Sequence, residues 1–252
     1  MKIYVVTHKK FNPPKIMGYI PIQVGKINTN EKLGYISDDT GINIAEKNST
    51  YCELTALYWM WKNDVSNENI GLCHYRRYFT TNPFSTLEKY YISEKFVDEH
   101  LKKVDIILPQ KVYLKTSVAE KYSLTNAGFQ KDLDTVRDVI QKEFPEYLSS
   151  YDKVMNGNQQ YFWNMFITRR KLMNDYCEWL FSIMSKVENL TNLEGYSVRQ
   201  KRIFGYISER LLNVWVEKNK LSIYECPVVQ SDQGEIATIK SNIGIMLKKK
   251  RM

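Results

Sequence analysis

The sequence lacks the features that would span a membrane or build a zinc site. It contains no run of about 18 apolar residues, so we expect no transmembrane helix. The first residues turn polar too soon for a secretory signal peptide. The four cysteines show no C-x-x-C spacing and no paired histidines. These absences predict a cytoplasmic protein, in a reducing compartment, without a bound metal.

The chain also lacks a well-placed D-x-D motif, the acidic pair that usually anchors a metal-bound diphosphate in sugar-nucleotide enzymes. Asp38 and Asp39 are adjacent, and the triplet at 132–134 falls in a helical pattern where we expect it to face solvent. The segment around Asp38 and Asp39 is typical of a turn, and a ribose or metal site is the alternative. The absence favours basic side chains over a divalent ion as the partners of a diphosphate.

The net charge of +8 is concentrated at the two ends of the chain. Residues 1–30 hold five lysines and residues 236–252 hold four lysines and one arginine, and neither segment holds an acid. A nucleic-acid binder would more often spread its basic residues over one face of the fold, so we expect no nucleic-acid partner. The apolar and basic end fits peripheral contact with an anionic membrane, or else a solvated tail.

Hydrophobic patterning predicts alternating strands and helices. A helix over 49–62 would open with a capping box formed by Thr50 and Glu53. The alternation indicates one α/β domain over 1–235, with a mainly parallel sheet flanked by helices, followed by a basic tail over 236–252. The expected strands cover 3–6, 69–74, 105–109, 160–168 and 221–226, and the other expected helices cover 85–103, 129–143, 146–155, 170–188 and 199–218.

His74, Arg76 and Arg77 follow the second strong strand, where ligands of open α/β sheets bind. Two arginines at a strand end can neutralise a diphosphate through bidentate hydrogen bonds. Neighbours in an extended chain point to opposite faces, so one of the two is alternatively a surface group. His8 follows the first strand in the same way.

Several other polar residues lie in apolar surroundings and have a structural alternative to a functional role. Glu53 would complete its capping box or face a site, and Glu209 with Arg210 would form a salt bridge or a site. Asn164 stands in an aromatic segment and needs partners from the backbone or from a ligand. The 18 tyrosines and 5 tryptophans fit sugar-binding surfaces, or simply a tyrosine-rich core.

The longest distinctive segment, residues 71–79 (GLCHYRRYF), resembles the family known as domain of unknown function 4422. Further segments that carry the resemblance are 39–44, 51–63, 164–167, 176–181 and 205–211. The resemblance implies a GT-A-like, Rossmann-type glycosyltransferase of capsule, exopolysaccharide or O-antigen synthesis. It further implies a UDP-sugar donor, with galactose or galactofuranose favoured, and a lipid-linked or glycan acceptor. The enzyme would then work in the cytoplasm, at the inner face of the cell membrane.

With this resemblance, the polar residues can be given hypothetical roles. The diphosphate and nucleotide would bind Thr7, His8, Lys9, Asp38, Arg76, Arg77, Arg199 and Arg202. The sugars would contact Tyr75, Trp163 and Asn164. Catalysis would use His74 at the leaving group and Glu53, Asp39 or Glu209 as the general base of an inverting reaction. No metal or other cofactor is expected.

Two other classes of function remain open. One is a module that binds phosphorylated glycans or nucleic acid without chemistry, for which binding would weaken steeply with salt. The other is a phosphotransferase or nucleotidyltransferase, for which activity would require magnesium.

Overall fold

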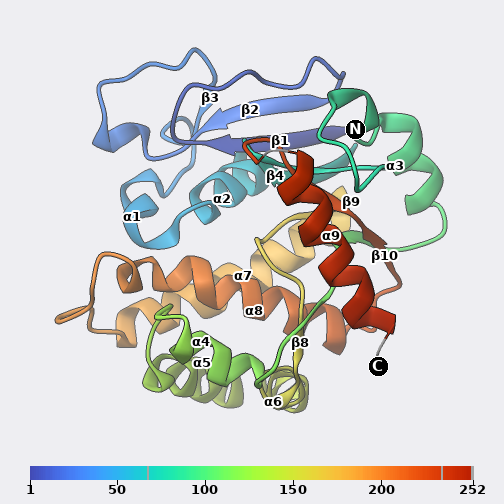
Figure 1. Ribbon diagram of the computed structural model, residues 1–252. Helices are drawn as coiled ribbons and strands as arrows, with labels where there is room; N and C mark the ends of the chain where they lie inside the picture. The colour runs from blue at the N-terminus through green and yellow to red at the C-terminus, as the bar shows by residue number, and fades with distance from the viewer. Residues whose placement is uncertain (67, 234, 251–252) are drawn as a thin grey trace.

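A central sheet with strand order β10-β6-β9-β4-β1-β2-β3 organises the computed structural model, which describes residues 1–66, 68–233 and 235–250 (Figure 1). All neighbouring strands in it are parallel except β9, which runs antiparallel to both β4 and β6. The β-branched run of β1 explains its central position, because both faces of that strand are buried. The strands are β1 (Lys2–Thr7), β2 (Tyr19–Gln23), β3 (Ile36–Ser37), β4 (Asn69–His74), β5 (Arg77–Phe79), β6 (Ile106–Pro109), β7 (Val112–Tyr113), β8 (Gln159–Gln160), β9 (Phe166–Arg169), β10 (Ile223–Cys226) and β11 (Val228–Gln230).

Helices cover both faces of the sheet. Figure 1 shows α7 and α8 between the sheet and a further layer formed by α4, α5 and α6. On the opposite face, α3 packs against β6 and β9. The helices are α1 (Asn48–Tyr51), α2 (Leu54–Asn63), α3 (Glu94–Leu101), α4 (Val118–Leu124), α5 (Gln130–Glu143), α6 (Leu148–Asn156), α7 (Arg170–Leu190), α8 (Ile203–Lys218) and α9 (Glu235–Lys250).

Alternation along β1 divides the core in two. Tyr4 and Val6 join the larger cluster with the helices α2, α7 and α8, whereas Ile3 and Val5 join a smaller cluster on the face of α3. Gly71 in β4 lets β9 approach closely, because a Cβ there would lie 2.7 Å from the carbonyl oxygen of Phe166. The predicted mainly parallel α/β architecture is therefore confirmed.

The antiparallel strand β9 determines what reaches the carboxyl edge of the sheet. Phe166, its first residue, pairs with Leu72 near the end of β4, and Arg169 pairs with Asn69 at the start of β4. The segment just before β9 therefore lies beyond the carboxyl ends of the parallel strands. This is the edge at which ligands of such sheets bind.

The predicted helix over 49–62 is broken at Cys52. Cys52 has φ 55°, a left-handed conformation, and it separates α1 from α2. The predicted capping box is wrong, because the Thr50 hydroxyl donates to the Lys47 carbonyl and Glu53 points elsewhere. Helical periodicity continues across the break, so the pattern alone conceals it.

The predicted strand over 160–168 is interrupted in the same manner. Only β8 and β9 are extended, and between them Trp163 and Asn164 adopt φ values of 75° and 53°. The aromatic run predicts a strand, but hydrogen bonds with His74, Glu209 and Glu53 hold Trp163 and Asn164 in the left-handed region.

The helix predicted from Ser85 begins later, at Glu94, with the Ser93 hydroxyl as its N-cap. The segment before it makes tertiary backbone hydrogen bonds instead, among them Thr81 N to Tyr90 O and Ile92 N to Phe79 O. These bonds satisfy backbone groups that a helix would have paired internally.

Asp132 is buried rather than solvent-facing, which corrects the expectation for the 132–134 triplet. Its carboxylate accepts hydrogen bonds from the hydroxyls of Tyr122 and Tyr196 and from the Phe129 backbone amide. It therefore ties the start of α5 to its neighbours, and a buried carboxylate needs such partners.

The basic segment over 236–252 is helical as far as the structure describes it, in α9. The helix contacts the rest of the chain through Asn242, whose side chain donates to the Pro83 carbonyl at 2.7 Å, and Thr238 is buried. Among the described residues, no helix combines the length and the apolar character needed to cross a bilayer.

Candidate active site

A cavity of about 680 Å³ opens at the carboxyl edge of the sheet. Its walls come from the ends of β1 and β4, the α1–α2 break, the segment before β9, the end of α4 and the start of α8. The volume is in the range of ordinary ligand sites. The predicted residues that line it are Thr7, His8, Glu53, His74, Tyr75, Arg76, Arg77, Trp163, Arg199, Arg202 and Glu209.

The two arginines after β4 both reach the cavity. His74 pairs with Arg77 across a two-residue turn, so Arg76 and Arg77 are not neighbours in an extended strand, and the alternation rule does not apply to them. Arg77 lies over the Trp163 ring at 5.2 Å, and its Nε is buried without a hydrogen-bond partner among the described residues. Arg76 forms an exposed ion pair with Asp232 at 3.2 Å.

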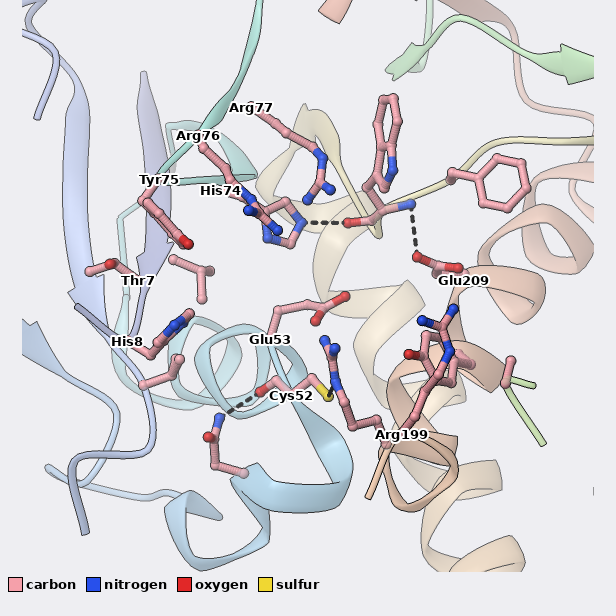
Figure 2. A pocket seen from close by; sticks show the side chains of 18 of the residues that line it. Thr7, His8, Cys52, Glu53, His74, Tyr75, Arg76, Arg77, Arg199 and Glu209 are labelled. Carbon is pink, nitrogen blue, oxygen red and sulfur yellow. Dashed lines mark hydrogen bonds between the residues drawn. The ribbon is translucent and has the colours of Figure 1, made fainter. Parts of the chain in front are cut away.

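Cationic side chains face one another across the cavity. Figure 2 shows Arg76 and Arg77 above the centre of the cavity and Arg199 below it. Arg202 also lines the cavity. Lys121 and Arg210 complete this set, whereas the only carboxylates among the lining residues that the structure describes are Glu53 and Glu209. Such an excess of guanidinium groups suits a ligand with several negative charges, such as a diphosphate.

The left-handed pair Trp163–Asn164 holds three titratable side chains at once. The Trp163 amide donates to Glu209 Oε1 at 3.0 Å, and its carbonyl accepts from His74 Nε2 at 2.7 Å. The Asn164 side-chain amide donates to Glu53 Oε1 at 2.7 Å and to the Gly205 carbonyl at 3.1 Å. Two residues of irregular backbone thus fix Glu53, His74 and Glu209 relative to one another, as strained backbone often does at functional sites.

Glu209 has the protonation behaviour of a general base or acid. Burial raises its pKa to about 7; the Glu53 carboxylate also raises it, whereas Arg210 and the Trp163 amide oppose the rise. Arg210 Nη1 lies 3.9 Å from the Glu209 carboxylate, at the limit of an ion pair. A carboxyl group with a pKa near neutral pH can exchange a proton during turnover.

His74 is neutral at physiological pH. Burial lowers its pKa, the nearby arginines lower it further, and the bond to the Trp163 carbonyl and the Glu53 charge only partly compensate. Because Nε2 donates to that carbonyl, Nδ1 carries the lone pair. His74 can therefore accept a hydrogen bond but cannot supply a positive charge.

The break at Cys52 directs Glu53 into the cavity. Figure 2 shows the Glu53 carboxylate pointing toward the middle of the pocket, between the upper arginines and the segment of Cys52. Gly205 of α8 permits this geometry, because a Cβ there would lie 3.2 Å from both Cβ and Sγ of Cys52. Burial raises the pKa of Cys52 to about 11, so its thiol is not the nucleophile.

One end of the cavity is aromatic. His8 and Tyr75 meet edge to face with ring centroids 5.5 Å apart, and the Phe11 ring centroid lies 6.0 Å from that of Tyr75. Thr7, the last residue of β1, and Val24, which directly follows β2, also line the cavity. An aromatic and partly polar surface beside cations fits a nucleoside joined to phosphates.

Four predicted site residues do not line the cavity. Asp38 is buried and accepts from the Thr55 hydroxyl at 2.6 Å, so it fastens its loop to α2. Asp39 is exposed and accepts from Ser37 within the turn. The Lys9 ammonium group lies over the Tyr75 ring, 5.2 Å from its centroid. Asn164 does not line the cavity, but its side-chain amide holds Glu53, which does.

Sequence reasoning missed a further group of lining residues. Lys121 lies in α4 and Thr125 directly follows it, and no helix was predicted there; Cys52 was given no site role. Arg210 was considered only as the partner of Glu209. The charged pair Glu209-Arg210 in an otherwise apolar helix was the sequence feature that could have identified Arg210 as a site residue. Across the described ranges, no group of three or more His, Cys, Asp or Glu could hold a metal ion.

The family model of the domain of unknown function DUF4422 matches residues 2–220. The chain belongs to this family. Among solved structures, the chain is similar to WbbM, described as a bifunctional glycosyltransferase in its apo form, with a TM-score of 0.85 and 30% sequence identity. The match covers 92% of this chain and 45% of the WbbM chain, so this DUF4422 chain spans less than half the length of that protein. No curated protein matches it.

Both findings confirm the resemblance and the fold class predicted from the sequence. The family match ends at residue 220, so it contains every residue of the cavity wall named above. The residues that line the cavity therefore all lie in the segment that matches the family.

Proposed function

We propose that this protein is a glycosyltransferase that moves a hexose from a UDP-sugar to a lipid-linked or glycan acceptor in surface-polysaccharide synthesis, without a metal ion. The observation that carries the proposal is the cavity at the sheet edge, with arginines on opposing walls and two carboxylates between them. The likeness to WbbM, a protein described as a glycosyltransferase, supports the same class of reaction. Galactose or galactofuranose as the transferred sugar rests on the family resemblance.

In this mechanism the donor lies across the cavity from the aromatic end to the carboxylates. The nucleoside packs near Thr7, His8 and Tyr75, and its diphosphate reaches Arg76 and Arg77. As the bond between the anomeric carbon and the diphosphate oxygen breaks, negative charge grows on the leaving diphosphate. The positioned guanidinium groups stabilise that charge more in the transition state than in the ground state.

The acceptor hydroxyl needs a base, and we assign this role to Glu209 in an inverting reaction. Its carboxylate takes the hydroxyl proton while the acceptor oxygen bonds to the anomeric carbon. The pKa near 7 and the fixed orientation by the Trp163 amide support Glu209 over Glu53. Glu53 then faces the sugar as a carboxylate that favours the positive charge developing at the anomeric carbon.

Donor hydrolysis by the purified protein tests the proposal. A panel of UDP-sugars is incubated with and without a chelator, and free UDP is measured. We expect release from one or a few hexose donors, unchanged by chelation, and a loss of about 100-fold or more in Arg77→Ala. An absolute requirement for magnesium would favour a phosphotransferase, and an absence of UDP release with any donor or acceptor would favour a binding module.

A further inference from the structure

Two loops beside the mouth of the cavity expose large apolar side chains. Leu124 ends α4 and is 67% exposed, and Phe129 precedes α5 and is 40% exposed. Val198, in the loop between α7 and α8, is 87% exposed. Figure 1 shows this α7–α8 loop extending past the ends of the neighbouring helices, on the side of the fold away from α9.

The two loops form one continuous surface. The Gln200 side chain donates to Asn126 Oδ1 at 3.2 Å across the gap between them. The rings of Phe129 and Tyr196 meet edge to face at 5.0 Å. Lys131 lies over both rings, at 5.5 and 5.2 Å. The loops that carry Leu124, Phe129 and Val198 therefore contact one another, and we call the exposed surface of these three side chains and the basic residues beside them the rim surface.

Basic residues surround these apolar side chains. The segments 118–131 and 191–202 contain the bases Lys121, Lys131, Arg199, Lys201 and Arg202 against the acids Glu120 and Glu194. Exposed aliphatic and aromatic groups set among lysines and arginines match the interface of an anionic bilayer, where the apolar groups enter the acyl region and the cations meet the headgroups.

The rim surface leads directly into the cavity. Lys121 of α4, Thr125 of the first loop and Arg199 of the second line the cavity wall. A molecule anchored in a bilayer under the rim would therefore present its head group to the carboxylates over a short distance. This link to turnover rests on the proposed function, whereas bilayer contact itself does not.

We propose that the rim surface docks on an anionic lipid bilayer and so admits a lipid-linked acceptor to the cavity. A second copy of the chain fits the surface less well, because a symmetric contact would bring its cations against the same cations. The basic helix α9 lies elsewhere on the fold, so the proposal assigns membrane contact to a different place than the charge of the chain ends suggests.

Vesicle sedimentation without any donor sugar tests the docking. The full chain is mixed with vesicles of phosphatidylcholine, alone or with phosphatidylglycerol. We expect binding only to the anionic vesicles. The partition coefficient should fall about tenfold or more in the double variant Leu124→Ser/Val198→Ser, which removes two apolar anchors. It should fall about fivefold in Lys201→Gln, which removes one cation near the surface.

The matched control is Ile236→Ser on α9, a site that is 72% exposed and lies off the rim surface. This variant should bind as the wild type does, and all variants should keep their melting temperature and their vesicle-free UDP release. Wild-type binding by the double variant, loss of binding in Ile236→Ser, or no binding of the wild type to anionic vesicles would each overturn the proposal. Loss of UDP release in the wild type would instead contradict the proposed function alone.

Discussion

At the scale of single residues, the site depends on the different surroundings of its two carboxylates. The Glu209 side chain is 14% exposed, lies next to Arg210 and is held by a backbone amide, whereas Glu53 points into the cavity and is held by a side-chain amide. Two carboxyl groups with separate environments can take separate roles in one reaction.

Replacing Glu209 by Gln should remove the general base. We expect kcat to fall by about 100-fold or more, the usual contribution of a positioned base. In the wild type, kcat/KM should drop as the pH falls through about 7, because Glu209 then becomes protonated and cannot accept the acceptor's proton. Initial rates across pH measure both effects. Glu194→Gln, on an exposed loop, is the control, and a Glu209→Gln enzyme with wild-type turnover would contradict the assignment.

Replacing Glu53 by Gln should move the pH profile. The Glu53 charge is one of the causes that raise the pKa of Glu209, so its removal should lower that pKa and shift the acidic limb of kcat/KM to lower pH. Asp39→Asn, outside the cavity, should leave the limb in place. A limb that stays fixed or moves to higher pH in Glu53→Gln would show that the two carboxylates do not interact as described.

The sequence predicted most of these residues but not their relations. Strand-end position identified His8, His74, Arg76 and Arg77, because the carboxyl edge of a sheet follows from strand direction alone. The contacts of Glu53, in contrast, depend on residues more than 100 positions away along the chain. No local pattern carries that information.

At the scale of elements, the break between α1 and α2 and the close approach of α8 act together. Cys52, with a positive φ, lies so close to Gly205 that a Cβ added there would lie 3.2 Å from its Cβ and Sγ. Helical periodicity predicted a single helix over 49–62, since the apolar residues on either side of the break keep the same spacing. The break at Cys52 packs against Gly205 of α8, a contact between distant segments that the local sequence pattern does not reveal.

Gly205→Ala should disturb this contact. The added methyl group meets Cβ and Sγ of Cys52 at 3.2 Å, and Cys52 cannot rotate its Cβ away, so the free energy of unfolding should fall by about 1–3 kcal/mol. Turnover should fall as well, because Glu53 is displaced. Thermal unfolding and UDP release measure the two effects.

Gly244→Ala in α9 is the matched control for Gly205→Ala. A Cβ at position 244 meets no heavy atom within 4 Å, so this change should stabilise the protein by up to about 1 kcal/mol through helix propensity. Equal effects of the two substitutions would show that the contact with Cys52 does not constrain α8.

At the scale of the whole molecule, charge placement guides the expected chemistry. The chain ends hold much of the net charge, yet the cavity gathers its own six cationic side chains from four separate parts of the chain. Composition shows that the chain ends are basic, but it does not show which cations surround the cavity. These side chains come together only when the elements pack.

Removal of divalent ions should leave turnover unchanged if the cationic side chains of the cavity stabilise the leaving diphosphate. We expect UDP release in excess chelator to match release in magnesium within about twofold, since guanidinium groups can supply the stabilisation that a metal supplies elsewhere. The Arg76→Ala enzyme measured in parallel should lose activity under both conditions. Restoration of that variant by added magnesium would indicate that a metal normally takes part.

The position of β9 also has a consequence for how the protein is made. Its strand fills the gap between β4 and β6, although residues 166–169 follow β6 by more than 50 positions. During synthesis the sheet cannot close until this late segment emerges from the ribosome, and such distant pairings form slowly. The same segment brings Trp163 and Asn164 to the carboxylates. If the proposed function holds, a half-made chain has no aligned catalytic groups and cannot hydrolyse a nucleotide sugar before folding is complete.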